Sequence, residues 1–174
     1  MSFSAAAPPA PAARSSLLIG VLGTVLVLGY ALFAALQVQV LNPLATVPGS
    51  SLGEIHAAVG RTSDTMGWGL MIAALLPGPL IAATAALTAR RGRLSARGLL
   101  MIMLGLLALG TPIYLVASFP AGMTLADTFG VGGADHAPWA RILHTISLVA
   151  VLALATTIIH HAATRRPQAE ADGA

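Results

Sequence analysis

The chain has 174 residues, of which 56% are hydrophobic and only 9% are charged, whereas about 25% are charged in ordinary soluble domains. So few polar groups cannot cover a soluble surface, and we expect lipid to cover most of the chain. The net charge of +3 comes from arginines that flank apolar segments, which argues against a nucleic-acid partner. The absence of cysteine excludes disulfides, thiolate metal ligands and cysteine nucleophiles.

Apolar segments dominate the chain between two polar ends. Backbone groups find no water inside lipid, so each segment long enough to cross it, about 20 residues, should be helical. The ends, 1–16 and 162–174, are rich in small and polar residues or proline, which predicts disorder. The sequence therefore predicts an all-α fold, a four-helix transmembrane bundle over 17–161, with spans at 17–40, 66–89, 99–119 and 140–161.

The first apolar segment has one alternative interpretation. It follows Arg14, as the apolar core of a signal peptide would follow a basic residue. It exceeds the usual 7–15 residues of such a core, however, and no small-residue cleavage motif stands at its end. We therefore interpret it as a true span.

The arginines predict the orientation. Only Arg61 and Arg141 flank the spans on one side, and basic residues concentrate in cytoplasmic segments. Trp68 and Trp139 lie at the ends of spans on that same arginine-poor side, where indole rings favour the membrane interface. Arginine without lysine, with abundant alanine, glycine and proline, is typical of GC-rich bacterial genomes. We therefore predict a bacterial cell-membrane protein with both termini in the cytoplasm, on the side of Arg14, Arg90, Arg91, Arg93, Arg97, Arg165 and Arg166.

Prolines interrupt two of the spans. Pro77 and Pro79 enclose a glycine in the second span, and Pro112 lies in the third. Each proline removes an amide donor and clashes with the carbonyl four residues earlier, so we expect kinks. The freed carbonyls could form a hinge or a binding ledge. The favoured interpretation is that the kinked helices only pack, with nearby hydroxyl groups satisfying the carbonyls.

The remaining polar groups of the spans are few. No aspartate or glutamate lies within any span, which argues against a proton relay or an ion-coupled transporter. Histidines and arginines end the fourth span at a helix C-terminus, where cations are favoured, and make a weak candidate for binding a metal or an anionic lipid: His160, His161, Arg165 and Arg166. The hydroxyl residues predict hydrogen bonds between helices: Tyr30, Thr111, Tyr114, Ser118, Thr156 and Thr157.

The first long loop should carry a short surface helix. Asn42 precedes a proline, which predicts the end of the first helix. Ser51 and Glu54 then match a capping box, which predicts a helix over about 52–60. Asp64 is placed to cap the second span.

The second long loop is rich in glycine, and we expect it to be mobile. Asp135 is predicted to cap the fourth helix. Arg141 and His144 share one face of that helix, and we predict that both face the mouth of the bundle, where Arg141 pairs with Glu54, Asp64 or Asp135. Both loops thus contribute to one candidate polar rim, which we define as Glu54, His56, Asp64, Asp135, His136, Arg141 and His144.

Two functions fit the polar rim. Histidines beside carboxylates could bind a transition metal or act as general acid and base. No metal-binding spacing is present, so the sequence predicts no metal and no cofactor, and caps and ion pairs are the favoured interpretation. The sequence thus favours a non-enzymatic accessory or assembly subunit, whose partners are the lipid bilayer and other membrane proteins or copies of itself. The alternatives are a small enzyme acting on a lipophilic substrate at the rim and, third, an oligomeric pore.

Overall fold

The computed structural model describes residues 11–62 and 66–171, with side chains described for 15–62 and 66–163. All regular secondary structure in this part of the chain is helical, which confirms the all-α class. Four helical rods are long and apolar enough to cross a membrane, as in a multi-pass membrane protein: Ser15–Thr46, Trp68–Arg90, Ala96–Phe129 and Ala140–Ala163.

Three of the four rods consist of consecutive helical pieces. The first contains α1 (Pro11–Leu36), a π-helical turn η1 (Gln37–Leu41) and α2 (Asn42–Thr46). The second contains α4 (Trp68–Leu75) and α5 (Pro77–Arg90), and the third contains α6 (Ala96–Ala108) and α7 (Gly110–Phe129). The fourth is α8 (Ala140–Ala171), and the short helix α3 (Leu52–Arg61) connects the first two rods.

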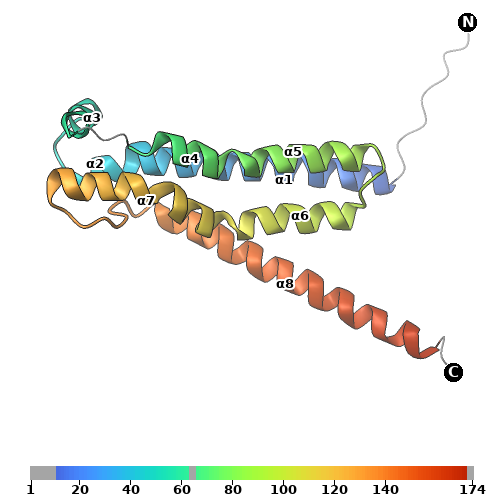
Figure 1. The fold of residues 1–174 in the computed structure, drawn as a ribbon. Helices are drawn as coiled ribbons and strands as arrows, with labels where there is room; N and C mark the ends of the chain where they lie inside the picture. The colour runs from blue at the N-terminus through green and yellow to red at the C-terminus, as the bar shows by residue number, and fades with distance from the viewer. Residues whose placement is uncertain (1–10, 63–65, 172–174) are drawn as a thin grey trace, which may run out of the picture.

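The helices do not form a closed four-helix bundle. The first and second rods lie side by side along their length, and α4 packs against α7 (Figure 1). The last helix, α8, packs along α6 and diverges from the other helices toward its C-terminal end (Figure 1). We call the end with the α5–α6 turn the arginine-rich end, and the end with α3 and the α7–α8 loop the loop end.

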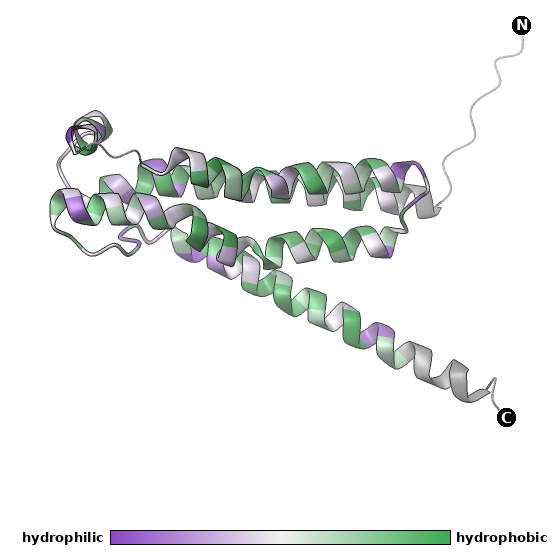
Figure 2. Cartoon of the chain, viewed as in Figure 1, coloured by the Kyte–Doolittle hydropathy of each residue, from purple (hydrophilic) through white to green (hydrophobic). Residues whose placement is uncertain are grey.

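An apolar belt surrounds the rods. On α1 it extends from Leu17, 45% exposed, to Leu36, 44% exposed. These 20 residues span about 30 Å at 1.5 Å per residue, the thickness of a hydrocarbon core. Trp68 and Trp139 are about half exposed at the loop-end border of this belt, and hydrophilic residues gather mainly at the two ends of the rods (Figure 2). The turn η1 therefore lies where the first rod leaves the apolar belt.

The prediction that the first helix ends at Asn42 is wrong, because the rod continues to Thr46. The reason is the π-helical turn. The Asn42 amide donates to the carbonyl of Gln37, five residues earlier, which makes this turn wider than an α-helical turn. Pro43 occupies the first turn of α2, where a proline is tolerated. The wider turn thus lets the chain pass a proline without ending the rod.

The third rod is also longer than expected. Its helix runs through Pro120 to Phe129, ten residues past the predicted end of the span. Pro120 packs directly on Gly67, where a Cβ atom would lie 2.6 Å from the proline side chain. Ala117, Ala121 and Leu125 are buried at a spacing of four residues. Tertiary packing along this face therefore outweighs the cost of a proline inside the helix.

The structure places helix breaks near the prolines of the spans. The second rod is interrupted at Leu76, directly before Pro77 and three residues before Pro79. The third is interrupted at Leu109, three residues before Pro112. The prediction of interhelical hydrogen bonds is wrong for Ser118, Thr156 and Thr157, whose hydroxyl groups donate to carbonyls of their own helices.

Candidate polar site at the loop end

Asn42 joins the first rod to the α7–α8 loop. Its side chain is buried, at 6% exposure. Its Oδ1 accepts two backbone amides of the loop, from His136 at 2.7 Å and from Ala137 at 3.3 Å. A buried amide without an acceptor destabilises the folded state by about 1–3 kcal/mol. The Asn42 side chain supplies an acceptor to two amides of the loop. The start of the fourth rod is thus held at a defined position against α2.

His136 makes a second connection to α2. The Thr46 hydroxyl donates to the Asn42 carbonyl at 2.7 Å, and its oxygen lies 3.3 Å from Nδ1 of His136. A hydroxyl has a single proton, so the Thr46 oxygen is the acceptor in the second contact. The network therefore favours the tautomer in which Nδ1 of His136 carries the proton.

Tyr114 connects the third rod to the same loop. Its buried ring ends in a hydroxyl that donates to Oδ1 of Asp135 at 2.7 Å. The Gln37 side chain also contacts this hydroxyl, and its Nε2 donates to the carbonyl of Ala137 at 3.4 Å. Three separate segments, η1, α7 and the loop, therefore meet at one tyrosine hydroxyl.

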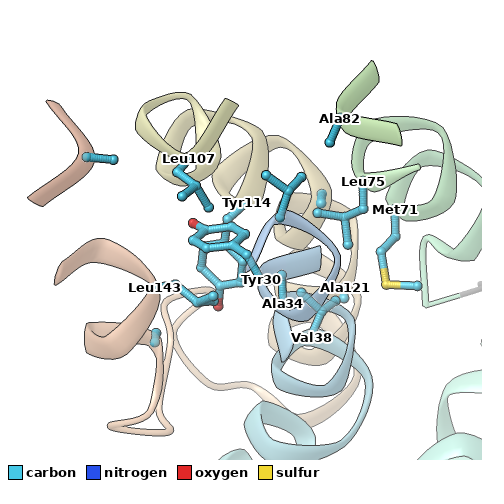
Figure 3. Close-up of a cluster of buried hydrophobic side chains, with 14 of the residues drawn as sticks. Tyr30, Ala34, Val38, Met71, Leu75, Ala82, Leu107, Tyr114, Ala121 and Leu143 are labelled. Atoms are coloured by element: carbon cyan, nitrogen blue, oxygen red, sulfur yellow. The ribbon is translucent and has the colours of Figure 1, made fainter. Parts of the chain in front are cut away.

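A second group of contacts lies deeper and joins α1, α7 and α8. The helix break before Thr111 frees its backbone amide, which donates to the Ser147 hydroxyl at 3.0 Å, and Ser147 in turn donates to the Tyr30 hydroxyl at 3.3 Å. The Thr111 hydroxyl lies 3.1 Å from Nδ1 of His144, and the His144 ring meets the Tyr114 ring edge-on with centroids 5.8 Å apart. Figure 3 shows Tyr30 and Tyr114 in the same group of buried side chains as Leu107 and Leu143.

Together these contacts form one continuous structure, which we call the polar cluster. It begins at the exposed Asp135 and ends at the buried Ser147, two turns inside the apolar belt. It contains groups from every rod except the second: Tyr30, Gln37, Asn42, Thr46, Thr111, Tyr114, Asp135, His136, His144 and Ser147.

The structure brings only part of the predicted polar rim into this cluster. Asp135, His136 and His144 belong to it. The predicted cap at Asp135 is wrong, because α8 begins at Ala140 and the carboxylate accepts the tyrosine hydroxyl instead. Asp64 lies outside the described residues, together with its predicted role as a cap.

Arg141 does not form the predicted ion pair with Glu54 or Asp135, and its third predicted partner, Asp64, lies outside the described residues. Arg141 is exposed, and within the described part of the chain its side chain has no hydrogen bond or ion pair. The buried stripe of α8 passes through Ala140, Leu143 and Ser147, and Arg141 lies beside this stripe on the outward face. A long side chain there can extend along the helix and keep its charge in water.

Helix α3 contains the remaining rim residues, at a distance from the cluster. Its predicted capping box is confirmed, because the Ser51 hydroxyl accepts the Glu54 amide and the Glu54 carboxylate accepts the Ser51 amide at 2.7 Å. The bonds from the Ser51 amide and hydroxyl lower the pKa of Glu54. His56 is half-buried, and its Nε2 has no hydrogen-bond partner among the described residues.

Sequence reasoning missed the residues that organise the cluster. Gln37, Asn42, Thr46 and Ser147 are buried, and each lies at the end of a span or inside it. The available signal was the segment QVQVLNP, which places two glutamines and an asparagine at the end of an apolar run. Amide side chains there need partners, and the π-helical turn that contains both glutamines is a feature often found at functional sites.

The hydrogen bonds of the polar cluster suit the joining of helices better than the binding of a metal ion. Over the residues that the structure describes, no group of three or more histidines and carboxylates could hold a metal ion. Five hollows on the same part of the chain lie between rods, and none of the five is lined by Asn42, Tyr114, Asp135 or His144. Comparison with protein-family models, curated proteins and solved structures finds no match to this chain.

Proposed function

We propose that this chain is a non-enzymatic subunit of a membrane assembly and that a partner helix packs on α8. The observation that carries this proposal is the course of α8. Its loop-end half is fixed by the polar cluster, but no described side chain beyond Ala150 is buried. Ile159 is 68% exposed and Leu152 is 59% exposed. A span fixed at one end, and largely exposed at the other apart from the contact between Arg97 and His161, offers a helix surface to another protein.

The polar cluster supports this interpretation. Asn42, Thr111, Tyr114 and Ser147 use their hydrogen bonds to join rods and loop. In lipid, apolar contact alone drives helices together weakly, so interhelical hydrogen bonds and close packing decide which helices associate. A cluster of this kind gives the loop end one rigid shape, as a docking subunit requires.

The arginines support an orientation with both termini in the cytoplasm of a bacterial cell. Four exposed arginines, 90, 91, 93 and 97, lie at the arginine-rich end, and two, Arg61 and Arg141, lie at the loop end. In a cysteine-free chain this orientation has a direct test. A membrane-impermeant maleimide should label Gly60→Cys in intact cells and Arg93→Cys only after permeabilisation. The reverse labelling would contradict the orientation.

The partner surface can be tested by the same route. A benzophenone maleimide attached to Leu152→Cys on α8 should cross-link to a second protein chain in native membranes. Leu22→Cys on α1 is the matched control, because the two leucines are 59% and 60% exposed. Adducts from Leu152 alone, identified by mass spectrometry as a defined chain or a second copy, support the proposal. Only lipid adducts, or equal adducts from both positions, would contradict it.

One observation favours the alternative function, an enzyme for a lipophilic substrate. The Oε1 atoms of Gln37 and Gln39 are buried and have no hydrogen-bond donor among the described residues. An unsatisfied buried carbonyl is rare in folded proteins and could accept a hydrogen bond from a bound molecule. In that case a small molecule should co-purify with the wild type in stoichiometric amount and be lost from Gln37→Leu.

A further inference from the structure

Two hollows adjoin at the arginine-rich end of the molecule. The first has a volume of about 540 Å³ and lies between the start of α1 and the α5–α6 turn. The second, about 370 Å³, is a groove between α1 and α5. Ser16, Leu17 and Arg90 line both hollows, so the two lie next to each other. A hollow that contains one arginine and two serines thus adjoins a groove on the membrane-facing surface.

The first hollow has the chemistry of an anion site. Arg90 lines it and is exposed, and within the described part of the chain its guanidinium has no partner. Ser95 also lines it; its oxygen accepts the Gly98 amide, which leaves its hydroxyl proton available to a ligand. Ala96, the first residue of α6, completes this side, and the positive end of a helix dipole favours an anion.

The charges around this hollow are of one sign. Arg91 and Arg93 are exposed on the adjoining turn. The acidic residues whose side chains the structure describes, Glu54, Asp127 and Asp135, all belong to the loop end. No described carboxylate therefore neutralises these arginines, and a bound anion would.

The groove has the chemistry of an acyl-chain site. Leu17, Val21 and Val25 line it from α1, and Ala83 and Leu87 line it from α5. The α1 residues extend over eight positions, or about 12 Å at 1.5 Å per residue. They belong to the apolar belt, so a hydrocarbon chain in the groove would lie at membrane depth.

We propose that the two hollows together bind one anionic phospholipid. Its phosphate lies against Arg90, Ser95 and the first turn of α6, and one acyl chain lies in the groove between α1 and α5. Basic pockets between membrane helices bind phospholipid headgroups, and in this hollow Arg90 supplies the positive charge. The site needs the rods to cross a bilayer, but it depends neither on a protein partner nor on which face of the membrane the arginine-rich end occupies.

Native mass spectrometry of the full-length protein in mild detergent tests the headgroup half of this proposal. Phosphatidylglycerol should bind as one tight molecule per chain, and phosphatidylcholine with the same acyl chains should bind more weakly. Arg90→Gln should weaken the phosphatidylglycerol about five-fold, since one arginine contributes about 1 kcal/mol near an anionic surface. Arg61→Gln, an exposed arginine of the loop end, is the control and should bind normally.

A second pair of variants tests the groove. Ala83→Trp fills it from an exposed position and should reduce lipid binding. Ala155→Trp, exposed on α8 and outside both hollows, should not. Equal binding of the two lipids, or equal behaviour of Arg90→Gln and Arg61→Gln, would overturn the headgroup assignment. Unchanged binding by Ala83→Trp would overturn the acyl-chain assignment.

Discussion

Replacement of Gly110 by alanine should destabilise the protein strongly. Gly110 is buried where α1 and α8 approach the start of α7. A Cβ atom there would lie 2.5 Å from Cζ of Tyr30, 2.8 Å from its hydroxyl and 2.9 Å from the Ser147 hydroxyl. Tyr30 is itself buried, at 7% exposure, so its ring has little room to move away. The added methyl group must therefore separate helices or turn the tyrosine out of the cluster.

The magnitude follows from three effects. Overpacking of a filled site costs about 1–3 kcal/mol, and contacts this short favour the upper end. Displacement of Tyr30 also breaks its bond from Ser147 and disturbs the Ser147–Thr111 bond, each contributing about 0.6 kcal/mol in membrane proteins. Alanine offsets about 1 kcal/mol of this through its higher helix propensity. We expect a net loss of about 3 kcal/mol, or roughly 6–12 °C in unfolding temperature for a chain of this length.

Gly105→Ala is the matched control for this measurement. Gly105 lies five residues earlier in the same rod, and nothing lies within 4 Å of its Cβ position. The same substitution should there raise the unfolding temperature slightly, because only the gain in helix propensity remains. Thermal unfolding in mild detergent, followed by circular dichroism, compares the two variants. Equal shifts for Gly110→Ala and Gly105→Ala would refute the close approach of Tyr30, and with it the deeper part of the polar cluster.

Three further predictions concern the loop end and the second rod. Asn42→Ala leaves two loop amides without their acceptor and should lower the free energy of unfolding by about 2–3 kcal/mol. The amide of His136 should then exchange faster, and unchanged exchange would contradict the role of Asn42. The pKa of Glu54 is lowered in the folded state. The stability that Glu54 gives to α3 should therefore be complete above the ordinary glutamate pKa and be lost as the pH falls through the lowered pKa. Amide-exchange protection of α3 should show this loss in the wild type but not in Glu54→Gln. Pro77→Ala and Pro79→Ala should lower the unfolding temperature or leave it unchanged, because both prolines lie in the first turn of α5, where a proline is tolerated. A large gain in unfolding temperature would instead reveal stored strain.

The sequence predicted correctly those parts of the molecule whose structure is determined by residues close together in the chain. Spans are recognised by the length of an apolar run, and α3 by the Ser51–Glu54 capping box, which is complete within four positions. Both signals depend on local chemistry alone. The ends of the rods were harder, because Pro43 and Pro120 are local stop signals that the structure overrides. At Pro43 a wider helical turn absorbs the proline, and at Pro120 packing on Gly67 outweighs it.

The structure brings together only part of the predicted polar rim, for a different physical reason. Asp135 stands five residues before α8, where an acidic residue predicts a helix cap, but its carboxylate meets a tyrosine of another rod. Arg141 and His144 were paired by their spacing on one helix, and they separate because His144 contacts Thr111 of another rod whereas Arg141 is exposed. Spacing along one helix says which residues share a face. It does not say which face the neighbouring rods cover.

Which face of a helix the neighbouring rods cover depends on the polar groups that find no hydrogen-bond partner in lipid. Leucine and valine are as well solvated by acyl chains as by another helix, so most of the apolar residues of this chain carry little information about which rods touch. Glycine at 110, which permits close approach, and amide or hydroxyl groups such as Asn42 and Ser147, which have no water to bond, carry much more. The residues that determine how the rods meet are therefore the small and polar minority. The buried polar groups of the described chain gather mainly toward the loop end, whereas Gly23 brings α1 close to Met103 of α6 in the other half. Beyond Ala150 no described residue of α8 is buried, and this exposed half is where we propose that a partner helix packs.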